Sequence, residues 1–230
     1  MINKSGFISV NNLISKKNIN KIKREIINYG KKISNKNFKD LNTLLSSLEK
    51  KQITNLYNFT QYYLFKNSFI SLRLIREKLN LKNKKIIENI PAVRFDFPND
   101  KKFSLGWHQE INNPGKFGRK FFQIWVPLSI SKINGGGLHI KLNKKNKVFR
   151  HKLIKNKQLR KYEIINQSSK QFKRLKDIKI EKKVGEGLIL FPKTIHKTMR
   201  NNSNVIRLTF TQSFHIVEKG TNFPKIHLVK

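Results

Sequence analysis

The chain has 230 residues, of which 37% are hydrophobic and 10% aromatic, a globular composition with enough chain for the core of one domain. Its formal net charge of +37 at pH 7 favours anionic partners such as phosphates, nucleic acids and anionic membranes. Because cysteine is absent, disulfide frameworks, zinc–thiolate sites and thiol nucleophiles are excluded.

The positive charge has two interpretations. Most of the basic residues are Lys, and Lys, Asn and Ile recur along the whole chain, as AT-rich codons would produce. The charge would then reflect coding bias and carry no function. The alternative is a nucleic-acid-binding protein, whose affinity for DNA or RNA would depend strongly on salt.

The first part of the chain has a helical pattern. A short strand is expected over residues 6–10, and the pattern over 15–33 predicts a helix that Ser15 caps. Residues 40–81 continue with stripes of Leu and aromatic residues, which core packing explains. We therefore expect residues 1–85 to be mainly helical support. The apolar residues at helical spacing in the first helix are Ile19, Ile22, Ile26 and Ile27.

From residue 86 onward, short apolar runs alternate with turn signals rich in Gly, Asn and Pro. Many short strands with this punctuation are typical of a sandwich or barrel. We therefore expect residues 86–215 to form a β-rich core on which the helices pack. The expected strands are 91–98, 102–110, 120–130, 136–142, 178–184, 187–192 and 205–214.

Residues 143–177 interrupt this rhythm with a densely basic insertion. A weak helical pattern around Leu153–Ile165 predicts a helix there. Long insertions between strands often serve as lids or binding loops. The alternative is a solvated helix with a charged face.

The stretch WHQE places His108 two positions before Glu110. In an extended strand these two side chains point to the same face. Two His and one carboxylate on one face of an ion form the facial triad that holds non-haem Fe(II) in oxygenases. Three histidines further along the chain are candidates for the third ligand: His139, His151 and His196.

Arg207 follows His196 in the next expected strand. A guanidinium binds a carboxylate through two parallel hydrogen bonds. His196 and Arg207 therefore make chemical sense as a metal ligand and the anchor of 2-oxoglutarate. Arg94 either faces the same pocket or is a surface residue of its strand, and the sequence favours neither.

With these residues identified, the chain resembles the phytanoyl-CoA dioxygenase family of Fe(II)/2-oxoglutarate-dependent oxygenases. The resemblance covers most of residues 6–214 and implies one oxygenase domain over 1–230. It also implies a fold that is mainly β with α, a double-stranded β-helix (jelly-roll or cupin-like) core with an N-terminal helical layer. The matching stretches, in the family's order, are GFISVNNLIS, WHQE, QIWVPLSISKINGGGLHI, GEGLILFPKTIHKTM and IRLTFTQSF.

The resemblance implies a role for each matching residue. The iron ligands are His108, Glu110 and His196, and Arg207 binds the distal carboxylate of 2-oxoglutarate. The Gln109 side chain is expected to point away from the metal. The remaining cosubstrate-binding candidates are Thr198, Trp125 and Thr209, the last because it shares a strand face with Arg207.

The implied reaction couples O2 and the oxidative decarboxylation of 2-oxoglutarate to hydroxylation of an unactivated C–H bond in a small molecule. A carboxylate ligand favours hydroxylation over halogenation, which needs that position vacant for a halide. The basic insertion favours an anionic substrate that is nucleotide-linked, phosphorylated or CoA-linked.

Glu110 departs from the family pattern, in which the carboxylate ligand is usually Asp. The extra methylene moves the carboxylate outward, and metal sites tolerate small errors in ligand position only. Either Glu110 binds iron after a small backbone adjustment, or the chain is an inactive family member used as a binding module.

The N-terminus lacks the long apolar segment of a signal peptide. The most apolar run, residues 121–130, is too short to span a bilayer. We therefore expect a cytoplasmic protein without a membrane span.

Overall fold

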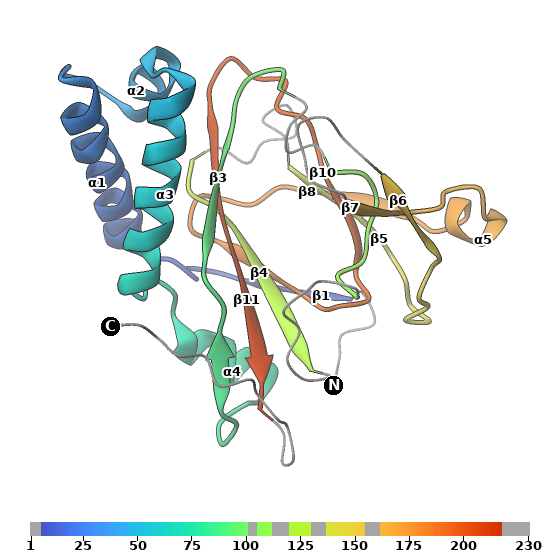
Figure 1. Cartoon of the computed structure of the whole chain (residues 1–230). Helices are drawn as coiled ribbons and strands as arrows, with labels where there is room; N and C mark the ends of the chain where they lie inside the picture. The colour runs from blue at the N-terminus through green and yellow to red at the C-terminus, as the bar shows by residue number, and fades with distance from the viewer. Residues whose placement is uncertain (1–5, 101–104, 112–119, 130–136, 155–161, 218–230) are drawn as a thin grey trace.

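The computed structural model describes residues 6–100, 105–111, 120–129, 137–154 and 162–217 (Figure 1). Helices dominate the chain before residue 86; α1, α2 and α3 lie side by side next to β3, and α4 lies near the lower end of β3 and β11 (Figure 1). This is the expected N-terminal helical layer. The helices are α1 (Lys16–Ser34), α2 (Leu41–Ser47), α3 (Lys50–Lys66) and α4 (Leu72–Leu79).

The first helix shows why this layer forms. The Ser15 hydroxyl accepts a hydrogen bond from the Asn18 N–H at 3.2 Å and caps the helix, as predicted. Ile19, Ile22 and Ile26 are buried at 3%, 0% and 0% exposure, because their spacing puts them on one face.

The major sheet is antiparallel in all its pairings, with the strand order β1-β9-β4-β11-β2, and β3 also pairs with β11. Alternate side chains of its strands, such as Phe122, Ile124 and Phe210, are buried in the core shared with the helices. The remaining side chains face the opposite way. The strands are β1 (Phe7–Val10), β2 (Ile86–Glu88), β3 (Ala92–Asp96), β4 (Phe121–Pro127), β9 (Gly187–Leu190) and β11 (Arg207–Ile216).

The minor sheet has the antiparallel order β10-β5-β8, formed by β10 (Ile195–Thr198), β5 (Leu138–Lys141) and β8 (Asp177–Ile180). Its inner side chains meet those of the major sheet in a second core. Two facing antiparallel sheets with a helical layer confirm the double-stranded β-helix. The buried members of the inter-sheet core are Trp125, Leu138, Ile140, Leu188 and Leu190.

Two sequence-based expectations are wrong. The segment around Leu153–Ile165 is a hairpin of β6 (His151–Ile154) and β7 (Tyr162–Ile165), not a helix. The Ile165 N–H bonds to the Trp107 carbonyl at 2.7 Å, a tertiary contact that overrides the weak helical pattern. The expected strand 102–110 is absent over its described residues, where His108 forms one isolated bridge and Glu110 lies in a turn.

The described part of the basic insertion packs on the outer face of the minor sheet. A third apolar cluster forms there, and the Lys141 ammonium lies 5.2 Å from the Trp107 ring centroid. The described part of the insertion therefore supports the minor sheet from outside, and residues 155–161 lie outside the described part, so the expected lid stays a prediction. The buried residues of this cluster are Trp107, Phe149, Ile165, Phe172 and Ile195.

Gln109 joins the insertion to the segment that carries His108. Its buried amide nitrogen donates to the carbonyls of Lys147 and Lys193 at 2.9 and 2.8 Å. Its amide oxygen accepts from the Phe149 N–H at 2.9 Å. As expected, the Gln109 side chain points away from the side on which His108 lies.

We predict that Gln109→Ala lowers the free energy of unfolding by about 1–3 kcal/mol, because the buried Phe149 N–H loses its acceptor. Gln109→Glu keeps that acceptor but sets a second carboxylate oxygen against the carbonyls of Lys147 and Lys193, so it should cost at least as much. The matched control Gln171→Ala removes an exposed amide and should stay within about 0.5 kcal/mol. Equal urea midpoints for Gln109→Ala and Gln171→Ala would contradict this anchoring role.

Candidate metal centre

The side chain of His196 converges with those of His108 and Glu110, which are distant from it in sequence, between the two sheets. One ligand atom from each of His108, Glu110 and His196 lies within 4.8 Å of the others. The Glu110 carboxylate oxygen Oε1 is 3.5 Å from His108 Nε2 and 4.0 Å from His196 Nε2. These are the three predicted metal ligands.

Main-chain pairing places the two histidines together. The N–H of each residue donates to the carbonyl of the other at 3.0 Å, an isolated antiparallel bridge at the edge of β10. Directly paired residues in an antiparallel ladder extend their side chains from the same face. The imidazole centroids are consequently 4.2 Å apart.

Both imidazole rings are oriented by a carbonyl two residues earlier in the chain. His108 Nδ1 lies 2.7 Å from the Gly106 oxygen, and His196 Nδ1 lies 3.1 Å from the Thr194 oxygen. A carbonyl accepts and cannot donate, so Nδ1 carries the proton in each neutral ring. Nε2 is left as the ligand atom on the side of Glu110, an arrangement typical of metal-binding histidines.

The protonation states of the centre also suit a cation. Burial opposes ionisation of Glu110, but a hydrogen bond and the charge of His108, with His196 and Arg94, lower its pKa to about 2. Burial lowers the pKa of His196 to about 3, and a charged His108 adds to this effect. At neutral pH Glu110 is therefore an anion and His196 is neutral, as metal ligation requires.

The donor set fits a transition metal in size as well. Ligands about 2.1 Å from a metal and adjacent to each other are about 3 Å apart. The separations of 3.5 and 4.0 Å need a small contraction. The extra methylene of Glu110 thus leaves its carboxylate within reach, since the turn at residues 110–111 brings it back toward the rings. Two imidazoles and one carboxylate are the set typical of non-haem Fe(II).

The other two histidine candidates lie elsewhere. His139 pairs with Lys197 on β10, so it faces outward with the insertion, where its Nδ1 is 3.6 Å from an Asp177 oxygen. His151 accepts the Gln109 N–H at 3.1 Å through Nε2. Within the described part of the chain, His196 alone completes the triad.

The candidate cosubstrate residues face the same inter-sheet space. Leu208 and Phe210 of β11 point toward the helices, so Arg207 and Thr209 point toward the minor sheet. Trp125 packs in the inter-sheet core. Thr198 follows His196 by two residues on β10 and shares its face.

Arg207 has a partner that the sequence analysis missed. Its Nε donates to Asp96 Oδ2 at 2.6 Å, and its Nη2 contacts the same oxygen. Asp96 is opposite Arg207 in the β3–β11 register, and the side chains are 1% and 6% exposed. The available sequence signal was the alternation of Arg94 and Asp96, but it does not reveal a pairing partner 111 residues away.

Arg94 faces the inter-sheet space, which answers the question that the sequence left open. It lies opposite Thr209 in the register, and its Nη1 is 3.5 Å from the Thr198 hydroxyl oxygen. Arg94 therefore reaches across from the major sheet to the strand that carries His196.

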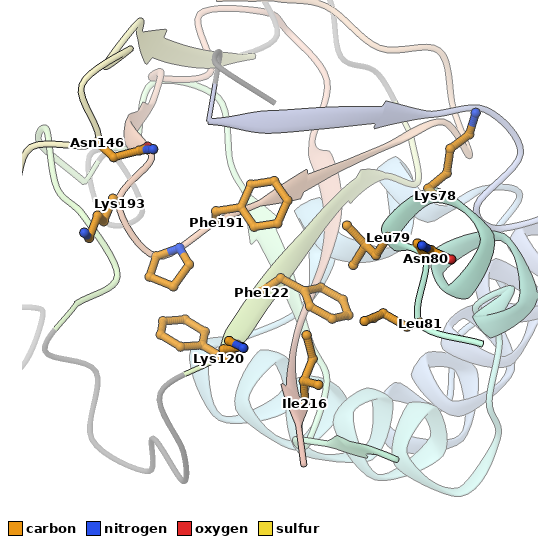
Figure 2. Close-up of a pocket in the computed structure, with 12 residues that line it drawn as sticks. Lys78, Leu79, Asn80, Leu81, Lys120, Phe122, Asn146, Phe191, Lys193 and Ile216 are labelled. Carbon is orange, nitrogen blue, oxygen red and sulfur yellow. The ribbon is translucent and has the colours of Figure 1, made fainter. Parts of the chain in front are cut away.

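A separate hollow of about 450 Å³ lies at the edge of the major sheet beside α4 (Figure 2). Its lining combines apolar side chains such as Leu79, Phe122 and Ile216 with the lysines Lys78, Lys120 and Lys193. No metal ligand of the triad lines it.

No helix in the part of the chain that the structure describes is both long and apolar enough to cross a membrane.

No protein-family model and no curated protein matches this chain. Solved structures do match it. The non-heme alpha ketoglutarate dependent carbocyclase SnoK from nogalamycin biosynthesis has a TM-score of 0.59 at 9% identity, over 92% of this chain and 79% of that one. EvdO2 from Micromonospora carbonacea var. aurantiaca, complexed with 2-oxoglutarate, has a TM-score of 0.58 at 13% identity, over 96% and 91% of the two chains.

The epimerase SnoN, in complex with Fe3+, alpha ketoglutarate and nogalamycin RO, matches with a TM-score of 0.53 at 9% identity, over 92% of this chain and 79% of that one. At these identities the likeness is one of fold. The chain therefore has the fold of non-haem iron, 2-oxoglutarate-dependent oxygenases, with a His-x-Glu…His triad assembled within it.

Proposed function

We propose that this protein is an Fe(II)- and 2-oxoglutarate-dependent dioxygenase that hydroxylates an unactivated C–H bond of a small molecule. The observation that carries the proposal is the triad of His108, Glu110 and His196, with both Nδ1 atoms hydrogen-bonded to carbonyls and both Nε2 atoms near one carboxylate. The resemblance of the sequence motifs to the phytanoyl-CoA dioxygenase family supports the same proposal.

The triad would hold Fe(II) through two imidazoles and one carboxylate, a facial set that leaves three coordination positions. Bound iron supplies O2 activation coupled to the conversion of 2-oxoglutarate into succinate and CO2, with one oxygen atom entering the substrate. The carboxylate of Glu110 keeps the third ligand position filled, which favours hydroxylation over halogenation.

The cosubstrate would lie between β10 and β11. Arg207 and Thr209 are proposed to face its distal carboxylate, while Thr198 and Trp125 line the rest of its path. All four side chains are buried on the inner faces of the sheets. The apolar neighbours of Trp125 exclude water from this space, which strengthens hydrogen bonds to a bound anion.

The proposed substrate class is a small anionic metabolite, such as a nucleotide-linked, phosphorylated or CoA-linked compound. The support is the net charge of +37, which raises the local concentration of anions around the protein.

We predict that anaerobic addition of 2-oxoglutarate to the Fe(II)-loaded protein produces a visible charge-transfer absorption. His196→Ala should abolish it, because removing a direct ligand costs more than the roughly 10–100-fold loss seen for residues behind the ligands. Arg207→Ala should weaken cosubstrate affinity and leave Fe(II) binding in place. Suitable controls are His139→Gln and Arg73→Ala, whose side chains lie on the outer face of the minor sheet and on exposed α4.

The wild-type protein showing no such absorption would contradict the proposal. Strongly salt-dependent DNA or RNA binding that survives both His108→Ala and His196→Ala would instead support the nucleic-acid alternative.

A second prediction concerns the departure from Asp. Because Glu110 already reaches both imidazoles, Glu110→Asp should withdraw the carboxylate by about 1.5 Å, one C–C bond. Fe(II) affinity should fall by about 10-fold, and Glu110→Gln should lower it further by removing the negative charge. Calorimetric Fe(II) titration checks this order. Tighter binding by Glu110→Asp than by the wild type would identify the natural site as an impaired one.

A further inference from the structure

Three charged side chains from neighbouring strands face the space between the sheets. Arg94 and Asp96 alternate on β3, and Arg207 begins β11 directly opposite Asp96. Thr209 is opposite Arg94 in the same register. All four side chains therefore project from one face of the major sheet.

The charge of Arg207 is already neutralised. Two of its guanidinium nitrogens contact the same Asp96 oxygen, and the two side chains are 1% and 6% exposed. Both contacts converge on one carboxylate oxygen, which pairs the two opposite charges directly. Asp96 thus occupies an edge of Arg207 that an incoming carboxylate would otherwise use.

Arg94 differs from Arg207 in its partners. Among the described residues no carboxylate lies within 4 Å of it, and its hydrogen bond goes to the neutral Thr198 hydroxyl. Burial lowers the pKa of Arg207 most, Asp96 raises it, and the charge of Arg94 lowers it again. Arg94 is therefore close enough to act on Arg207 while it touches the strand that carries His196.

Two buried oxygen atoms beside these cations lack a hydrogen-bond partner among the described residues. They are Thr209 Oγ1 and Asp96 Oδ1. A buried hydroxyl without a partner costs about 1–3 kcal/mol. A carboxylate placed next to Arg94 would accept a hydrogen bond from the Thr209 hydroxyl and remove that cost.

The charges match a dicarboxylate at both ends. Two arginines and one aspartate leave one positive charge in this cluster. A divalent metal with Glu110 would leave one positive charge at the triad. Each end of 2-oxoglutarate carries one negative charge, so each would meet one compensating charge.

We propose that Arg94 is a cosubstrate-binding residue whose guanidinium holds the distal carboxylate of 2-oxoglutarate, with Asp96 fixing Arg207 as a neutralised wall of the same subsite. Thr198 positions the Arg94 side chain, and Thr209 donates to the bound carboxylate. This inference rests on the proposed function. It assigns the positive charge that binds the distal carboxylate to Arg94 on β3.

The test compares two ligands in binding, without turnover. 2-Oxoglutarate and 2-oxopentanoate share the metal-chelating end and the five-carbon chain, but 2-oxopentanoate lacks the distal carboxylate. Both are titrated anaerobically into the Fe(II)-loaded protein. Arg94→Gln should lower 2-oxoglutarate affinity by about 10–100-fold, as expected for a charge-assisted hydrogen bond. Its affinity for 2-oxopentanoate should stay unchanged.

Three further variants sharpen the result. Arg94→Lys, which keeps the charge but not the fork, should lose less than Arg94→Gln. Adding Asp96→Asn to Arg94→Gln frees the charge of Arg207 and should restore part of the affinity for 2-oxoglutarate. Arg73→Gln on exposed α4 is the matched control and should change neither affinity. Circular dichroism melts establish that each variant is folded.

Equal loss of both ligands in Arg94→Gln, or no loss of either, would overturn the proposal, since Arg94 would then act on the metal end or not at all. A wild-type protein that binds neither ligand in the presence of Fe(II) would overturn the proposed function itself, and the two failures are therefore distinguishable.

Discussion

The reciprocal main-chain hydrogen bonds between His108 and His196 are the interaction on which the site depends. They add one residue pair to the minor sheet and thereby fix two imidazoles on its inner face. The same alternation turns Trp107 and Gln109 to the outer face, where they bind the basic insertion. The described part of the insertion therefore holds the backbone on either side of His108.

Burial between the sheets explains the electrostatics of the site. An ionised group in such a space is costly unless another group compensates it. Asp96 compensates Arg207, whereas Glu110 lies beside two imidazoles and would be compensated by the cation that the triad holds. Among the described residues no carboxylate pairs with Arg94 within 4 Å, although its charge acts on Glu110 at longer range, and Arg94 is therefore able to receive an anion. The register of β3 against β11 sets Asp96 opposite Arg207 and Arg94 opposite Thr209. The major sheet therefore determines which of these charged groups are paired.

Local patterns predicted the helices and most strands, because amphipathic spacing and turn residues act over a few positions. The ordered motifs predicted that His108, Glu110 and His196 come together, and the structure brings them together. The Arg207–Asp96 pair was out of reach, since strand alternation gives two faces without saying which residue lies opposite. The strands β6 and β7 were missed because the apolar residues in this segment are spaced as in a helix. One of them, Leu153, is 55% exposed, so the apolar pattern there does not mark a buried face. Glu110 was expected in a strand, but it lies in a turn.

The most direct measurement is an anaerobic crystal structure of the protein with Fe(II) and 2-oxoglutarate. We predict iron bound to Nε2 of His108, Nε2 of His196 and the carboxylate of Glu110. We also predict the distal carboxylate of 2-oxoglutarate within hydrogen-bond distance of Arg94 and Thr209. Iron bound elsewhere, or a triad that takes up iron without Glu110, would contradict the central claim.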